Sequence, residues 1–176
     1  MPNGKTSVLR VFGRIWLAAF VLAAIYFILL SQCLPEKIAV HFDFSGRPNG
    51  FGPRDGFLML FGTIGLVTNG LLWLFSRWTE LIPDRLIHLP HKEEWLATPE
   101  LRLKFYDRLR STKYLLGAVL NIIFAGVQQI VYQYNMPDPF FRLPAEYFLP
   151  ALLVLPIASI FIPFFLFKPP VSGWKN

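Results

Sequence analysis

The side chains best suited to chemistry lie close together in one short segment, residues 34–52. His41 is followed two residues later by the carboxylate of Asp43, which could orient the imidazole or pair with Arg47 or Arg54. An imidazole can titrate near neutral pH, bind a metal or hold a fixed hydrogen bond. One imidazole and one carboxylate are fewer than the three or four ligands of a usual metal site, so we expect no metal and no cofactor here. We expect His41 and Asp43 to satisfy the backbone of an ordered loop instead.

The local pattern around these residues predicts a short strand followed by turns. Apolar side chains recur at every second position from Ile38 to Phe42, which predicts a strand with one apolar face. Glycine, proline and asparagine between Ser45 and Gly50 are typical of turns. Asp55 is then expected to cap the helix that follows.

The elements that must hold this segment are membrane helices. The 176 residues are 54% hydrophobic and 16% charged, whereas soluble domains average about 45–50% and 25%. Each of four apolar blocks is near the ~20 residues that cross a bilayer. We therefore expect an all-α membrane protein in a single domain, 1–176. Its four transmembrane helices would occupy about 13–33, 56–76, 114–131 and 147–167, with an outer strand and turn loop at 34–55 and a cytoplasmic loop at 77–113.

The distribution of cations predicts the orientation. Of the 17 lysines and arginines, 13 lie in the N-terminal tail, in residues 77–113 or in the C-terminal tail, and only Lys37, Arg47, Arg54 and Arg142 fall on the other side. The positive-inside rule then places both termini and the 77–113 loop in the cytoplasm. We expect an integral membrane protein with the lipid bilayer as its surroundings. Because the cations flank apolar blocks, we expect no nucleic-acid partner.

The 77–113 loop is expected to contain a basic amphipathic helix. A hydroxyl cap, a proline and an acid follow one another at Thr98-Pro99-Glu100, which is typical of a helix start. Leu101, Phe105 and Leu109 recur on one face, with basic residues elsewhere around the helix. No helix breaker precedes the third span, so the two segments are expected to form one helix. Such a helix would meet anionic lipid or a cytoplasmic protein partner.

Inside the expected spans, the polar side chains are few and share faces with small residues. Asn69 follows Gly62 and Gly65 on one stripe, and Asn121 and Gln128 lie on another. Small residues and amides stabilise contacts between membrane helices, so we interpret these stripes as packing seams. The alternative is that they line the path of a small transporter or channel.

Cys33, the single cysteine, ends a Leu-Leu-Ser-Gln-Cys run similar to a bacterial lipoprotein box. Gln32 stands where that box has a small residue, so we favour an uncleaved anchor with a partly buried thiol over an acylated cysteine. No glycine-rich phosphate loop, zinc-protease motif or nucleophile motif occurs, and an enzyme is not favoured. A membrane metalloenzyme built on His41 would need further ligands from Glu36, Asp138 or Glu146.

One ordered set of residues carries a family resemblance: Leu34, Pro35, Ile38, His41, Phe42, Gly46, Pro48 and Asn49. It resembles a bacterial membrane-domain family of unknown function that is also found at the front of SdpI-type immunity proteins. A second segment, from Leu89 to Arg102, is similar to one in short bacterial members. The resemblance implies a protein of the bacterial cytoplasmic (inner) membrane that senses or resists an extracellular agent, such as a peptide. The ligand-binding or structural candidates are the motif positions Pro35, His41, Gly46, Pro48 and Asn49, together with Asp43, which is selected because it follows His41 by two residues. The further C-terminal helices of SdpI proteins are lacking, and the sequence sets no oligomeric state.

Overall fold

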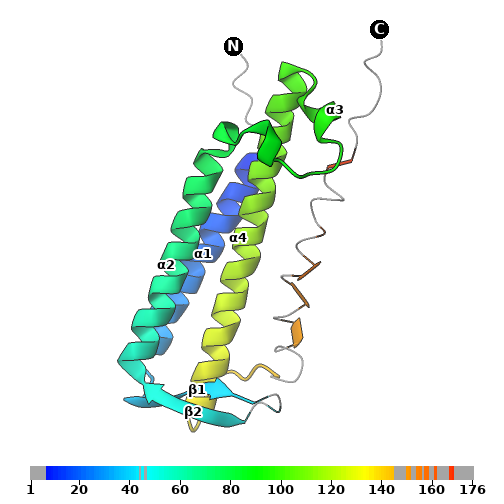
Figure 1. Cartoon of the computed structure of the whole chain (residues 1–176). Coiled ribbons are helices and arrows are strands. Elements are labelled where there is room, and N and C mark those ends of the chain that lie inside the picture. The colour runs from blue at the N-terminus through cyan, green and yellow to red at the C-terminus, as the bar shows by residue number, and fades with distance from the viewer. Residues whose placement is uncertain are drawn as a thin grey trace.

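Three long helices dominate the computed structural model, which describes residues 7–43, 45, 47–144, 150–151, 154–155, 157–158, 161 and 167–168. They are α1 (Ser7–Ser31), α2 (Arg54–Arg77) and α4 (Pro99–Asn135), and they lie side by side (Figure 1). The antiparallel strands β1 (Lys37–Phe42) and β2 (Pro48–Pro53) form a hairpin between α1 and α2. At the other end, α2 is joined to α4 by two 3₁₀ turns and a short helix: η1 (Thr79–Leu81), η2 (Asp84–Leu86) and α3 (Lys92–Leu96).

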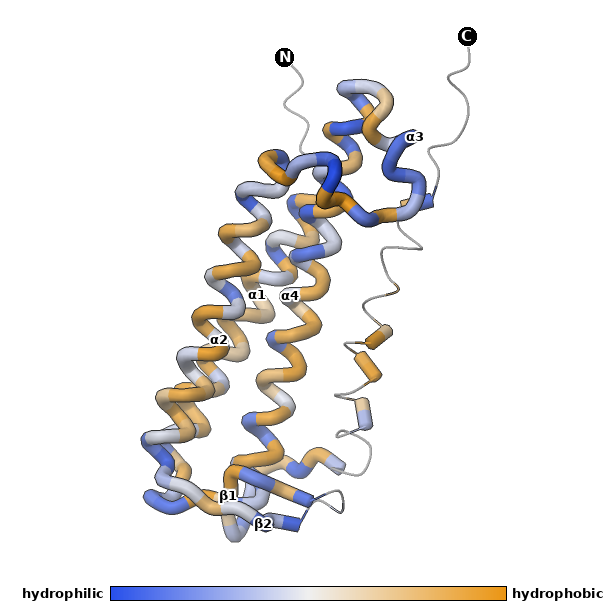
Figure 2. Tube along the Cα trace, in the orientation of Figure 1, coloured by the Kyte–Doolittle hydropathy of each residue, from blue (hydrophilic) through white to orange (hydrophobic). Residues whose placement is uncertain are grey.

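All three long helices are long and apolar enough to cross a membrane, over Leu9–Ser31, Arg54–Arg77 and Pro99–Asn135. The hydropathy of the chain follows the same division, with apolar positions along the helices and hydrophilic ones gathered near α3 and in the hairpin (Figure 2). The expectation of a helical membrane protein is met to this extent. The fourth expected span, 147–167, falls mostly outside the described residues.

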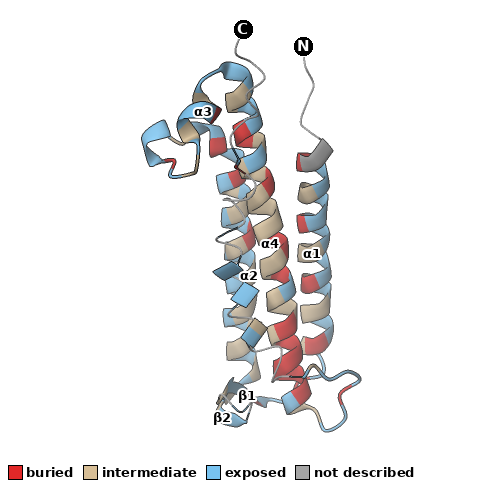
Figure 3. Ribbon diagram, turned by 90° about the vertical axis from the view of Figure 1, so that its right-hand side faces the viewer, coloured by how far each residue is buried: buried red, intermediate tan, exposed pale blue. Residues whose placement is uncertain are grey.

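Helix α4 is the centre of the bundle, and α1 and α2 each pack against it. In its most apolar stretch 44% of residues are buried, against 11% in α1 and 6% in α2 (Figure 3). The outward faces of α1 and α2 carry large exposed apolar side chains such as Leu22, Met59 and Leu66. Apolar side chains of this kind suit contact with lipid, and the backbone polar groups beneath them are already hydrogen-bonded within the helix.

The 37 residues of α4 make it about 55 Å long, well beyond the ~30 Å of hydrocarbon. The expected amphipathic helix and the third span are therefore one continuous helix. Its start is as predicted, because the Thr98 hydroxyl accepts a hydrogen bond from the Leu101 amide at 3.3 Å and Pro99 takes the first helical position.

A small apolar core secures the first part of α4 at the end of the molecule that carries α3. Its buried members are Ile87, Trp95, Phe105, Tyr106 and Phe167. The guanidinium of Arg108 lies 4.7 Å from the centre of the Trp95 ring, and both terminal nitrogens of Arg102 donate to the Asp84 carboxylate, at 3.0 and 3.1 Å. Trp95, which belongs to the segment from Leu89 to Arg102, thus contributes one buried side chain to this core.

Several expected details of the 34–55 loop are wrong. Pro48–Pro53 forms a strand where turn residues were expected, and Asp55 lies in the first turn of α2, behind an N-cap at Pro53. The single apolar face of β1 is also lost, because Ile38 and Ala39 are both buried while Val40 is exposed. The strand pairing explains the exposure of Val40. Ala39 and His41 pair with consecutive residues of β2, so Val40 is an extra, bulged residue of β1.

Candidate functional site

The hairpin is fixed to the end of α4 by a side chain far away in the sequence. Asn135 lies in the last turn of α4, and its Oδ1 accepts a hydrogen bond from the Ala39 amide at 2.7 Å. Its Nδ2 donates to the Ala39 carbonyl at 3.1 Å. One side chain therefore satisfies both backbone groups on the outer edge of β1, as a neighbouring strand would.

A second attachment joins the hairpin to the ends of α1 and α2. The Arg54 amide donates to the Glu36 carbonyl at 2.8 Å, and its guanidinium donates to the Leu34 carbonyl at 3.3 Å. Leu34 and Ile38 are buried against Leu30 of α1 and against α4. The hairpin is thus a packed cap on the bundle.

The polar candidates of the matched motif point away from this packing. His41 and Asn49 lie on opposite strands and are both exposed, and His41 Nδ1 forms a hydrogen bond with Asn49 Oδ1. Asp43 Oδ1 accepts from the amides of Ser45 and Arg47 at 2.9 and 2.8 Å, which closes the turn between the strands.

The remaining motif positions are at the edges of the hairpin. Pro35 and Pro48 are exposed, and Gly46 lies outside the described residues. Cys33 is exposed just beyond α1, so the expectation of a partly buried thiol is wrong. Close approach of the strands requires Gly50, because a Cβ there would lie 2.9 Å from the Cβ of His41.

Next to the hairpin, a cavity of about 520 Å³ opens between α2 and α4. Apolar side chains such as Phe57, Leu60 and Ile130 form its walls, and His41 stands at its rim. The arrangement offers an exposed imidazole and amide above an apolar recess.

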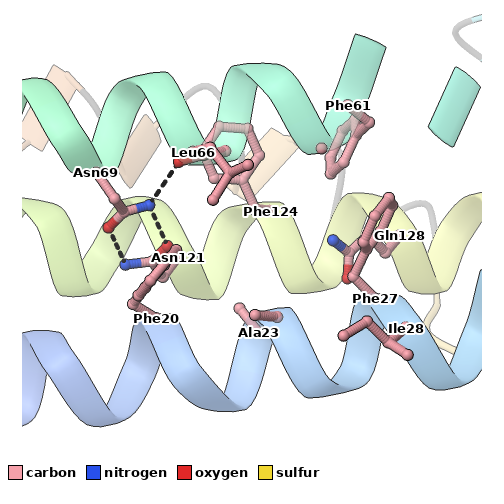
Figure 4. Close-up of a pocket in the computed structure, with 13 residues that line it drawn as sticks. Phe20, Ala23, Phe27, Ile28, Phe61, Leu66, Asn69, Asn121, Phe124 and Gln128 are labelled. Carbon is pink, nitrogen blue, oxygen red and sulfur yellow. Dashed lines mark hydrogen bonds between the residues drawn. The ribbon is translucent and has the colours of Figure 1, made fainter. Parts of the chain in front are cut away.

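The amides of the bundle interior form one hydrogen-bonded group. Asn69 of α2 and Asn121 of α4 exchange two hydrogen bonds of 2.9 and 3.0 Å (Figure 4). Trp16 Nε1 of α1 donates to Asn69 Oδ1 at 2.9 Å. Each amide also donates to a carbonyl of its own helix, at Gly65 or Gly117. Bonds of this kind contribute about 0.6–2 kcal/mol each in membrane proteins, so the group links all three helices.

Gln128 differs from the two asparagines. It lies about two turns beyond Asn121 on α4 and borders a cavity of about 220 Å³ among the three helices. Its Oε1 is buried and has no hydrogen-bond partner within the part of the chain that the structure describes.

Two neighbouring glutamines hold the segment after α4. Gln133 exchanges hydrogen bonds of 2.9 and 2.7 Å with the backbone of Leu143, and Gln129 donates to the Phe141 carbonyl. Gln129 Oε1 also accepts from the Tyr26 hydroxyl of α1. The last turns of α4 are therefore a polar junction for the hairpin, α1 and residues 136–143.

The described residues do not gather three metal-binding side chains at any point. Glu36 and Asp138 are not joined with His41 in such a group, and Glu146 lies outside the described residues. His91, one of the two histidines near α3, bonds Glu94 at 3.2 Å. The geometry therefore supplies no argument for the metalloenzyme hypothesis.

Sequence reasoning missed three residues that organise the site: Trp16, Arg54 in its bonding role, and Asn135. Trp16 and Asn135 find partners 53 and 96 residues away. Nothing in the sequence indicated the partner of Trp16. For Asn135, the position of a polar side chain in the last turn of an apolar helix was an indication that it has a partner.

Comparison with known proteins places the hairpin inside a recognised unit. Residues 18–65 match the model of DUF1648, a domain of unknown function. The match covers the second half of α1, the hairpin and the first half of α2, so it spans a helix–hairpin–helix unit. The likeness to SdpI-type immunity proteins stays a prediction.

The likeness also extends over the whole chain in an archaeal protein. An uncharacterized protein of Archaeoglobus fulgidus is 25% identical over 176 residues, which cover 98% of this chain and 93% of that protein. No solved structure matches the chain. The chain is thus similar to a domain of unknown function in its helix–hairpin–helix part, and to an archaeal protein of nearly the same length throughout.

Proposed function

We propose that this chain is a cytoplasmic-membrane protein that senses or resists an extracellular agent through the β1–β2 hairpin. The agent we favour is a peptide, as in the SdpI-type proteins that the motif resembles. The observation that carries the proposal is that the hairpin is held rigidly to three helix ends while His41, Asn49 and Phe51 remain exposed. A pre-organised surface loses little conformational entropy when it binds a partner.

The two edges of the hairpin differ in a way that supports peptide binding. Asn135 occupies the outer edge of β1, whereas β2 has no second strand beside it among the residues described. An extended peptide can add to such an edge through backbone hydrogen bonds. Pro48 and Pro53 bound the edge, so Asn49 to Gly52 would receive the peptide.

The proposed orientation places the hairpin outside the cell and the α3 end inside. It follows from the positive-inside rule, since residues 77–113, which include the first part of α4, carry eight of the 17 lysines and arginines. The arrangement of elements agrees with this division, because the hairpin and α3 lie at opposite ends of the bundle (Figure 1).

Deletion of the gene, followed by challenge with a panel of envelope-active peptides, tests the proposal. We expect the deletion strain to become more sensitive to at least one peptide, and the wild-type gene to restore resistance. Genes carrying His41→Ala with Asn49→Ala should fail to restore it at equal protein level in the membrane. A gene carrying Glu93→Ala and Arg85→Ala, exposed at the other end, serves as the matched control. Unchanged sensitivity of the deletion strain, or full rescue by the hairpin variant, would contradict the proposal.

A small transporter is the second candidate, and Gln128 is the observation that favours it. The buried Oε1 of Gln128 lies beside a cavity and has no partner among the described residues, so it could receive a passing solute. The mutual bonding of Asn69 and Asn121 argues against a polar path, because their amides are already satisfied. Solute flux into reconstituted vesicles that is abolished by Asn121→Leu and Gln128→Leu would favour transport, and flux that is insensitive to both changes would remove these residues from the route.

A further inference from the structure

A basic cavity lies at the end of the bundle opposite the hairpin, and the proposed hairpin function does not use it. Its volume is about 640 Å³, and it is bordered by all three long helices. We call it the arginine cavity. The residues that characterise it are Arg10 and Arg14 of α1, Ser76 and Arg77 of α2, and Arg110 and Tyr114 of α4.

Three of the four arginines have uncompensated charge. Arg10, Arg14 and Arg77 are exposed and form no ion pair with any residue that the structure describes. Arg110 differs, since it pairs at 2.6 Å with Glu80, the one acidic residue that borders the cavity among those described, and with Asp107 at 3.6 Å. Cations around one cavity repel each other, and an anion placed among them would relieve that repulsion.

A buried hydroxyl gives a second, independent indication of a ligand. Ser76 borders the arginine cavity and is 0% exposed, yet its Oγ has no hydrogen-bond partner among the described atoms. Buried hydroxyls in proteins are nearly always hydrogen-bonded. Arginine and serine together suit a phosphate, which accepts several hydrogen bonds at once.

The apolar surroundings distinguish a lipid phosphate from a soluble one. Gly13 and Leu17 continue the cavity along α1, and Phe20, Ala24 and Phe27 on the same face border the apolar cavity seen in Figure 4. Their spacing of three or four residues places them in one row along the helix. The two cavities therefore follow the same side of α1 where it faces α2, and an acyl chain could lie along this row.

Aromatic side chains indicate the depth of the arginine cavity. Trp78, which is 52% exposed, and Tyr114 both border it. Tryptophan and tyrosine concentrate at the level of lipid headgroups. The cavity thus stands where the phosphate of a membrane lipid would be found.

We infer that the arginine cavity binds the phosphate of an anionic phospholipid, with one acyl chain lying against α1 beside α2. Arg10, Arg14 and Arg77 neutralise the phosphate, and the Ser76 hydroxyl donates to one of its oxygens. The binding is non-covalent, and it does not depend on the hairpin function.

Native mass spectrometry of the full-length protein in non-ionic detergent tests the inference. The probes are phosphatidylglycerol and phosphatidylcholine of identical acyl chains, supplied at equal concentration. We expect one phosphatidylglycerol to bind in preference to phosphatidylcholine. The variant Arg10→Gln/Arg14→Gln/Arg77→Gln should bind it at least about tenfold more weakly, because each cation near a membrane phosphate contributes several-fold in affinity.

The matched control removes three cations from the hairpin end, as Lys37→Gln/Arg47→Gln/Arg142→Gln. It should keep the affinity for phosphatidylglycerol. Equal weakening in both triple variants, or equal binding of the two lipids, would overturn the inference. Displacement of the lipid by excess inorganic phosphate would also overturn it, because the site would then serve free phosphate.

A milder variant keeps the test informative if the triple variant fails to fold. Ser76→Ala should weaken phosphatidylglycerol binding about threefold through the lost hydrogen bond. The same change should leave the thermal stability of the lipid-free protein unchanged or higher, since it removes an unsatisfied buried group. Unaltered lipid affinity in Ser76→Ala would exclude the serine from the site.

Discussion

Replacing Gly117 by alanine should loosen the bundle where its three helices meet. A Cβ at this position would lie 2.6 and 2.8 Å from ring atoms of Trp16 and 3.0 Å from a methyl group of Leu72. The Trp16 ring has little freedom to move, because its Nε1 donates to Asn69 and the ring stacks on Tyr114. Relief of the clash therefore requires either a shift of α1 or loss of the Trp16–Asn69 bond.

The magnitude follows from three terms. Overpacking a core typically costs about 1–3 kcal/mol. A lost hydrogen bond between membrane helices adds about 0.6 kcal/mol, and the better helix propensity of alanine returns up to about 1 kcal/mol. We expect Gly117→Ala to lower the free energy of unfolding by about 0.5–3.5 kcal/mol.

Unfolding in mixed micelles of increasing sodium dodecyl sulfate content, followed by far-ultraviolet circular dichroism, measures this change. Gly65→Ala is the matched control, because a Cβ at Gly65 meets no atom within 4 Å. We expect the control to be as stable as the wild type or slightly more so. Equal stability of the Gly117 and Gly65 variants would refute the reasoning, because it would mean that the Trp16 ring does not fill the space above Gly117.

Two further predictions concern the ends of the bundle. Gly50→Ala should destabilise the hairpin by about 1–3 kcal/mol, because the new Cβ meets the Cβ of His41. Gly52→Ala is the control, since its Cβ makes only an ordinary contact at 3.5 Å. Hydrogen exchange of the hairpin amides measures both variants, and equal protection in the two would count against the close approach at Gly50. Trp95→Ala should lower the stability of the core beside α3 by about 3–5 kcal/mol, because the Trp95 side chain is 3% exposed. Trp73→Ala is the control and should cost far less, since Trp73 is 51% exposed. We expect faster hydrogen exchange of residues 78–98 in the Trp95 variant alone.

The parts of the fold that depend on local sequence could be predicted. The start of α4 is determined by Thr98 and Pro99, which act within one turn of the helix. The length and apolar character of the helices are likewise local, because each stretch must meet the thickness of the bilayer. The continuity of α4 followed from the absence of a helix breaker.

The parts that depend on partners far away in the sequence could not be predicted. Apolar periodicity marks a lipid-facing or packed helix, but it does not show that α4 is central. The bulge at Val40 changes which side of β1 is buried, and nothing in the alternation of residues 38–42 announces it. Asn135 looks like any polar residue at a helix end until its bonds to Ala39 are seen.

The residues of the candidate sites also divide into those that could be selected from local sequence and those that could not. The motif residues from Pro35 to Asn49 could be selected from the sequence, and their roles stay predictions. The arginine cavity could not be selected, because its cations come from α1, α2 and α4 and meet only when the three helices pack.

The central claim is that the three long helices cross the membrane with the hairpin outside the cell. Cys33, the single cysteine and exposed beside the hairpin, measures this directly. A membrane-impermeant maleimide should label Cys33 in intact cells. In the variant Cys33→Ser/Glu93→Cys, which places the thiol in α3, labelling should require permeabilised cells. Labelling of position 93 in intact cells, with Cys33 labelled only after permeabilisation, would contradict the account.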